Sequence, residues 1–116
     1  MELEVKKLVY DLDQAIDLII NFTAGKGWAD YQGDVLLRSA VERQFEIIGE
    51  ALNRLKKVDP GLLARISDYG RIIGFRNVLA HGYDIISDDI VWDIVESKLP
   101  GLRQEIDDIK RDLGIE

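Results

Sequence analysis

Apolar residues recur every three or four positions in two long stretches of the chain. The first stretch runs from about Leu3 to Thr23, and its apolar positions are Val5, Leu8, Leu12, Ala15 or Ile16, Ile19 and Phe22. This spacing lines them up on one face of an α-helix. The glycines of the next segment, Ala24–Gly27, can adopt the positive φ that ends a helix. The pattern therefore predicts a first helix over about residues 3–23.

The second stretch begins after Gly33. Asp34 is the expected N-cap, because its carboxylate can accept hydrogen bonds from the free amides of the first turn. The apolar positions that follow are Leu37, Ala40 or Val41, Gln44 or Phe45, Ile48, Ala51 or Leu52, and Leu55. The segment Val58-Asp59-Pro60-Gly61 breaks the rhythm, so the second helix is predicted to end near Lys57.

Two further helical stretches complete the chain. One is predicted over about residues 62–81, with disturbances expected at Gly70 and Gly74. The other starts at Ser87–Asp89, where acidic side chains favour a helix N-terminus, and Pro100 should kink it or divide it. No alternating strand pattern competes with these helices. The sequence therefore predicts an all-α protein: one domain over residues 1–116, built as an antiparallel bundle of four or five helices.

Composition excludes several classes of site. The chain has 116 residues with 22 acidic and 15 basic side chains, a net charge of −7. Cysteine is absent, which rules out disulfides, thiolate metal sites and cysteine nucleophiles. His81 is the single histidine, so no site can take two imidazoles from one chain. No apolar run approaches the roughly 18 residues of a membrane span, and Met1–Lys7 lacks a signal-peptide core. These features predict a cytoplasmic protein that does not enter the membrane.

The charges are distributed unevenly. Residues 54–76 hold six basic and two acidic side chains, net +4, whereas residues 1–53 have a net charge of −5 and residues 84–116 of −6. The basic segment leads directly into the only histidine. It can be interpreted as a solvated helix face or as a patch that attracts anions to an otherwise acidic protein.

The segment Arg76-Asn77-Val78-Leu79-Ala80-His81-Gly82-Tyr83 holds the best candidates for chemistry. On a helix, Asn77 and His81 lie on the same side, where the amide can orient the imidazole. Arg76 and His81 are five positions apart, about 140° around a regular helix, and do not converge on one atom. Two solutions stay open: a backbone distortion near Gly82, or a symmetric dimer that supplies groups from two chains.

These residue types suit RNA cleavage by attack of the RNA's own 2′-hydroxyl. Arg76 can bind a phosphate through two parallel hydrogen bonds and stabilise the charge that builds on its oxygens. An imidazole such as that of His81 can take and return a proton at neutral pH. The nucleophile belongs to the substrate, so neither a metal nor a cofactor is required. The structural alternative is that Asn77, His81 and Gly82 simply end the helix.

Other side chains also have two interpretations. Trp28 and Tyr31 could stack on RNA bases, but they are more simply read as apolar capping of the bundle. Glu46 and Glu50, four positions apart on the second helix, could line a dimer interface, although a solvated face is the simpler interpretation.

The Arg76-to-Tyr83 segment resembles the Arg-x-x-x-x-His-x-Tyr signature of the HepT-like branch of the HEPN superfamily. The likeness extends over nearly the whole chain, with its matching segments in the expected order. Besides the signature itself, it is carried by Asp11–Ile16, Phe22–Gly25, Ala40–Ala51, Ile72–Phe75, and Ile90–Val95 with Leu99-Pro100.

The resemblance implies an all-helical homodimer that acts as the toxin of a two-gene toxin–antitoxin pair. Its usual partner is a nucleotidyltransferase antitoxin of the MntA type. Carried over to this chain, Arg76 and His81 are the catalytic residues of metal-independent RNA cleavage, with Asn77 supporting them. Tyr83 is the phenol that the partner modifies with AMP, and the added phosphates would fill and neutralise the cleft.

Two other functions stay open on the sequence alone. One is a non-catalytic helical dimer that binds a nucleotidyltransferase or a nucleotide, with Tyr83 only as the modification acceptor. The other is a purely structural dimer. The occurrence of Arg76, His81 and Tyr83 together beside the basic segment favours the ribonuclease. Against it stands the strong net acidity, which slows the encounter with RNA unless positive charge is concentrated locally.

Overall fold

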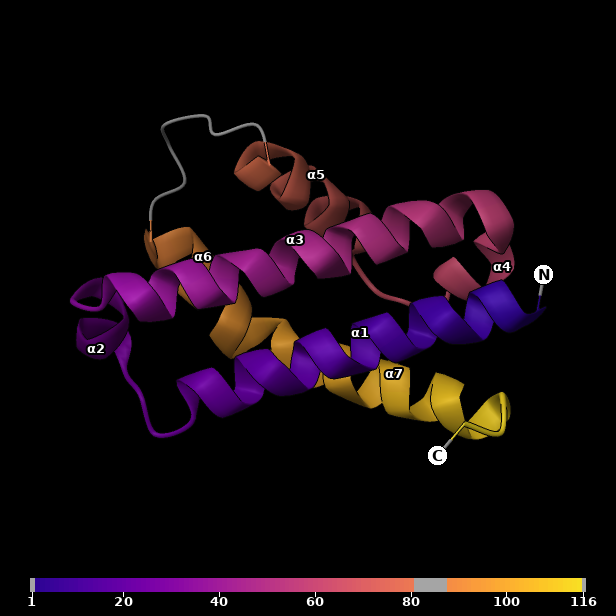
Figure 1. Ribbon diagram of the computed structural model, residues 1–116, viewed down its shortest axis with the longest axis horizontal. Coiled ribbons are helices and arrows are strands. Elements are labelled where there is room, and N and C mark those ends of the chain that lie inside the picture. Colours follow the sequence, from indigo (N-terminus) through magenta and orange to yellow (C-terminus); the bar gives the residue numbers. More distant parts are fainter. Residues whose placement is uncertain (1, 81–87, 116) are drawn as a thin grey trace.

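The computed structural model describes residues 2–80 and 88–115, and within these ranges every regular element is an α-helix (Figure 1). This confirms the all-α prediction. None of the helices in the described ranges combines the length and apolar character needed to cross a membrane. Two helices are short, α2 (Trp28–Gln32) and α4 (Pro60–Leu63), and five are longer: α1 (Glu2–Thr23), α3 (Val35–Val58), α5 (Tyr69–Ala80), α6 (Asp88–Ser97) and α7 (Leu99–Asp112).

Helix α3 is the one against which α1, α2, α4 and α5 pack. It lies between α1 and α5, runs antiparallel to both, and makes its most extensive contacts with these two helices (Figure 1). Helices α1, α3, α6 and α7 each turn an apolar stripe toward the common core, as the spacing predicts. The fully buried members of these stripes include Leu12, Ile16 and Ile19 of α1 and Ile48, Leu52 and Leu55 of α3.

An aromatic pair closes one end of the bundle. The rings of Tyr31 in α2 and Trp92 in α6 have centroids 5.1 Å apart. Tyr31 is 0% exposed, so it belongs to the core and its ring cannot stack on RNA bases. Burial, together with the nearby carboxylates of Glu42 and Asp88, also raises the pKa of Tyr31. The core interpretation of Tyr31 is therefore the correct one.

Two of the predicted helix boundaries follow directly from local chemistry. The carboxylate of Asp34 accepts a hydrogen bond from the amide of Leu37 at 3.1 Å and caps α3. Pro100 lies in the first turn of α7, where its missing amide costs nothing, so the last helical stretch is divided between α6 and α7 rather than kinked.

The prediction of one helix over residues 62–81 is wrong in its first part. Helix α4 ends at Leu63, and α5 begins only at Tyr69; the break precedes the glycines at which disturbances were expected. Asp68 adopts a positive φ of 57° and is held by an ion pair with Lys98. The amide of Ser67 donates to Glu105 at 3.0 Å. Tertiary contacts with α7 and with Lys98, which precedes it, therefore hold the break.

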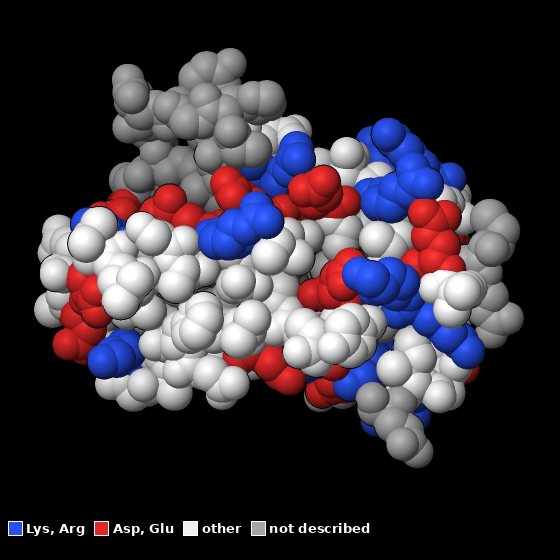
Figure 2. All heavy atoms as spheres, in the orientation of Figure 1, with Lys and Arg blue, Asp and Glu red and all other residues white. Residues whose placement is uncertain are grey.

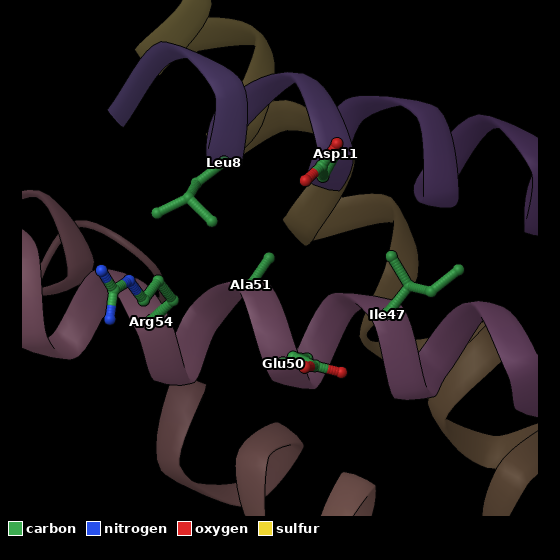
Figure 3. Close-up of a pocket in the computed structure, with 6 residues that line it drawn as sticks. All are labelled: Leu8, Asp11, Ile47, Glu50, Ala51 and Arg54. Carbon is green, nitrogen blue, oxygen red and sulfur yellow. The ribbon is translucent and has the colours of Figure 1, made fainter. Parts of the chain in front are cut away.

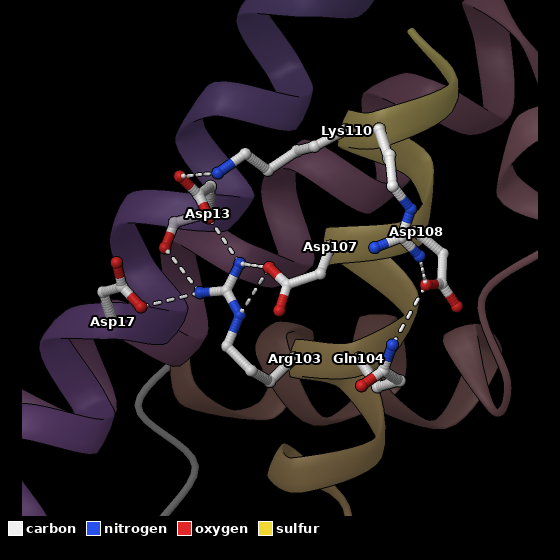
Figure 4. Close-up of polar contacts among 8 residues, drawn as sticks. Asp13, Asp17, Arg103, Gln104, Asp107, Asp108 and Lys110 are labelled. Carbon is white, nitrogen blue, oxygen red and sulfur yellow. Dashed lines mark hydrogen bonds and ion pairs between the residues drawn. The ribbon is translucent and has the colours of Figure 1, made fainter. Parts of the chain in front are cut away.

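A network of charged side chains joins α1 to α7 (Figure 4). Asp13 is buried, and its carboxylate accepts hydrogen bonds from Arg103 and, at 3.1 Å, from Lys110. Arg103 also contacts Asp17 at 2.7 Å and Asp107 at 2.8 Å. Burial alone would raise the pKa of Asp13, but the hydrogen bonds from Arg103 and Lys110 outweigh burial and hold the pKa below its ordinary value.

Candidate functional site

Arg76 is placed by the packing of α5 on α3. The residue before it, Phe75, is buried and meets Phe45 of α3 edge to face, with ring centroids 5.6 Å apart. Ile72, one turn earlier, is also buried. These apolar contacts fix the rotation of α5 about its axis, so the Arg76 side chain lies along the surface of α3 and is 24% exposed.

Gly49 lets the two helices approach closely at this point. A Cβ atom at position 49 would lie 2.1 Å from the Cβ of Arg76 and 2.6 Å from its Cγ. Both distances are far below van der Waals contact, so only glycine leaves room for the stem of Arg76. The bare backbone of α3 thus forms a slot that holds this side chain.

The guanidinium of Arg76 has two polar partners. Its Nη1 donates to the Oδ1 of Asn77 at 3.0 Å, and its Nη2 lies 3.6 Å from the Oε2 of Glu50. The Nε is buried and finds no hydrogen-bond partner among the described residues. Each Nη carries two hydrogens, so one contact on each still leaves a hydrogen for a phosphate oxygen.

Two of the four predicted site residues, His81 and Tyr83, lie outside the described residues. The structure brings the side chains of Arg76 and Asn77 into contact, and the supporting role of Asn77 stays a prediction. The predicted contact between Asn77 and His81, and the convergence of Arg76 with His81, stay predictions.

A cavity of about 310 Å³ opens between α1 and α3 (Figure 3). Its lining is half apolar and half charged, and consists of Leu8, Asp11, Ile47, Glu50, Ala51 and Arg54. Glu50 belongs both to this lining and to the ion pair with Arg76, so the cavity adjoins the candidate site. Two of its charged side chains are engaged elsewhere, Asp11 by Lys7 at 2.6 Å and Arg54 by Glu4 at 2.9 Å.

The arginines of the basic segment are paired with acids. In Figure 2, blue side chains lie beside red ones over much of the charged surface, and one group of blue side chains gathers at the upper right. This arrangement favours a solvated, internally balanced surface over one continuous anion-attracting patch. The pairs are Arg54 with Glu4 (2.9 Å), Arg65 with Asp112 (2.6 Å), Arg71 with Asp93 (4.0 Å) and Arg76 with Glu50 (3.6 Å).

Sequence reasoning assigned no functional role to Gly49 and left Glu50 as part of a solvated face or a dimer interface. The available signal was a glycine inside a strong helical pattern, where it costs stability unless another backbone or side chain must come close. Which residue comes close depends on how α5 docks, and that is not readable from local sequence.

The family model for ribonuclease HepT-like proteins matches residues 12–109 of the chain. The chain belongs to the HepT-like ribonuclease family. The match spans α1 to α7 and includes the contact region of Arg76 with α3, and it confirms the family resemblance read from the sequence.

Two relatives illustrate the range of this family. The chain is 31% identical over 110 residues to a Methanocaldococcus jannaschii protein named "Putative RNase MJ0127", covering 95% of this chain and 90% of that protein. It is 28% identical over 110 residues to the "Probable ribonuclease HepT" of Thermococcus cleftensis, covering 91% and 96% of the two chains. No solved structure matches the chain.

Proposed function

We propose that this HepT-like protein is a toxin that cleaves RNA without a metal ion, in the cytoplasm, as a homodimer. The observation that supports the proposal is the position of the Arg76 side chain. Helix α3 and Asn77 hold its guanidinium at the surface, and guanidinium hydrogens remain free to bind a phosphate. Membership of a ribonuclease family and the names of two relatives support RNA as the substrate.

In the proposed reaction, the 2′-hydroxyl of one nucleotide attacks the adjacent phosphorus. His81 takes the hydroxyl proton, the 2′-oxygen bonds to phosphorus, and the bond to the 5′-oxygen of the next nucleotide breaks. The leaving oxygen receives a proton from His81, so the products are a 2′,3′-cyclic phosphate and a free 5′-hydroxyl. Arg76 stabilises the additional negative charge on the phosphate oxygens during the attack.

A homodimer is the proposed source of a complete site. On a regular helix, Arg76 and His81 point about 140° apart, and a two-fold axis beside α5 would bring both groups from two chains to one cleft. The proposed second partner is a nucleotidyltransferase antitoxin of the MntA type, encoded with the toxin. It transfers AMP from ATP to the phenolic oxygen of Tyr83, with release of pyrophosphate and of the phenol proton, and the attached AMP adds negative charge where RNA phosphate must bind.

Co-expression tests the toxin, its partner and the modification together. Production of the chain alone should arrest growth, and His81→Ala should remove the arrest. Co-production with the neighbouring nucleotidyltransferase should restore growth and add the mass of AMP to Tyr83, as measured by mass spectrometry of the purified protein. Tyr83→Phe should stay unmodified and toxic beside the partner.

The same experiment distinguishes the alternative function. AMP on Tyr83 without any growth arrest by the unmodified chain would identify a non-catalytic module that only binds and is modified by its partner. Growth arrest that persists undiminished in His81→Ala would contradict the assigned proton shuttle.

A further inference from the structure

Arg76 meets Glu50 in a contact that contributes little to the stability of the fold. The Glu50 side chain is 70% exposed, and its Oε2 lies 3.6 Å from the Nη2 of Arg76. Exposed ion pairs at such distances contribute little to the free energy of unfolding. The main effect of this pair is therefore on the position of the Arg76 guanidinium, and not on the stability of the fold.

We propose that Glu50 is a positioning residue for Arg76, and that it aligns the guanidinium for the scissile phosphate. This inference rests on the proposed ribonuclease function. Glu50 would not touch the reacting atoms; it would act by holding Arg76 in the orientation that catalysis requires.

Three contacts define the position of Arg76, and Glu50 supplies one of them. The slot at Gly49 fixes the stem, where a Cβ would lie 2.1 Å from that of Arg76. Asn77 holds Nη1 at 3.0 Å from the α5 side, and Glu50 attracts Nη2 from the α3 side. Contacts at both terminal nitrogens restrict the rotation of the planar guanidinium about its long axis, so its free hydrogens favour one direction.

A carboxylate beside a phosphate-binding arginine has opposite effects on binding and on chemistry. It repels the incoming phosphate and competes for Nη2, so its removal should leave RNA binding unchanged or make it tighter. It also pre-orients the arginine, and loss of orientation slows the chemical step. A positioning role therefore predicts a lower kcat without a higher KM, a combination that loss of RNA affinity cannot produce.

The chain offers a matched control in Asp93. Asp93 of α6 pairs with Arg71, an arginine on the same helix as Arg76, at 4.0 Å, and its side chain is 64% exposed. Glu50→Gln and Asp93→Asn each remove one exposed acidic charge and one ion pair to α5. They change the net charge of the protein equally, and only Glu50→Gln alters the surroundings of Arg76.

The experiment measures kcat and KM for cleavage of an RNA oligonucleotide by wild type, Glu50→Gln, Glu50→Asp and Asp93→Asn. Glu50→Gln should lower kcat about tenfold with KM unchanged or reduced. Glu50→Asp, which keeps the charge, should recover part of the loss, and Asp93→Asn should stay close to wild type.

An unchanged kcat in Glu50→Gln, or an equal loss in Asp93→Asn, would overturn the role of Glu50 while leaving the ribonuclease function intact. A higher kcat in Glu50→Gln would also overturn it, since the carboxylate would then only compete with the phosphate. Wild-type protein that fails to cleave RNA at all would overturn the proposed function and this inference together.

Discussion

Arg76→Ala is expected to lower the rate of RNA cleavage by about 100- to 1,000-fold, the usual effect of removing one donor that stabilises charge in a transition state. Arg76 is seated against the backbone of Gly49 and keeps free hydrogens for a phosphate. Alanine removes both the hydrogen bonds and the positive charge at that point. The measurement is the single-turnover rate at saturating protein, which reports the chemical step and not RNA affinity.

Arg71→Ala is the control for general charge effects. Arg71 lies on α5 as well, is 53% exposed in its side chain and pairs with Asp93. Its removal lowers the net positive charge of the helix by the same amount, yet the single-turnover rate should stay within about twofold of wild type. Equal losses in the two variants would show that α5 only attracts RNA and that Arg76 has no specific role.

Asp13→Ala is expected to destabilise the fold by about 3 kcal/mol or more, because it leaves two largely buried cations without their shared carboxylate. Asp13 is 8% exposed, and the side chains of Arg103 and Lys110 are each 18% exposed. Denaturant unfolding followed by circular dichroism measures the change. Asp17→Ala, which removes a 56% exposed carboxylate from the same arginine, should cost less than about 1 kcal/mol.

The stability difference between wild type and Asp13→Ala should also depend on pH. The folded-state pKa of Asp13 is lowered, so its stabilising contribution is fully present above the unfolded-state pKa, about 3.9 for an aspartate. The contribution is lost as the pH falls through the lower folded-state value. The two unfolding free energies should therefore converge in acid, and a constant difference down to the lowest accessible pH would contradict this assignment.

Helices α1, α3, α6 and α7 were predictable because their signals are local. Each apolar stripe repeats within the helix that it defines, the carboxylate of Asp34 caps amides in the next turn, and Pro100 acts on the turn in which it stands. These features need no knowledge of the tertiary structure. The same holds for the candidate arginine, which stands in a short motif, Arg76 to Tyr83, that sequence alone identifies.

What the sequence could not predict depends on residues far apart in the chain. The break before α5 is held by Glu105 and Lys98, more than 25 positions after it in the sequence. The Asp13–Arg103 contact joins positions 90 residues apart. The need for glycine at position 49 arises only from the packing of Arg76 against it, a contact between two helices. The apolar pattern within one helix does not indicate which other helix packs against it.

The most direct test of the account is cleavage of an RNA oligonucleotide by the purified wild-type protein in buffer with a metal chelator. The expected result is cleavage that leaves a 2′,3′-cyclic phosphate and a 5′-hydroxyl, and that stops at a linkage whose preceding nucleotide lacks its 2′-hydroxyl. Continued cleavage at that deoxy-substituted linkage, or products ending in a 5′-phosphate, would contradict 2′-hydroxyl attack and the roles given to Arg76 and His81.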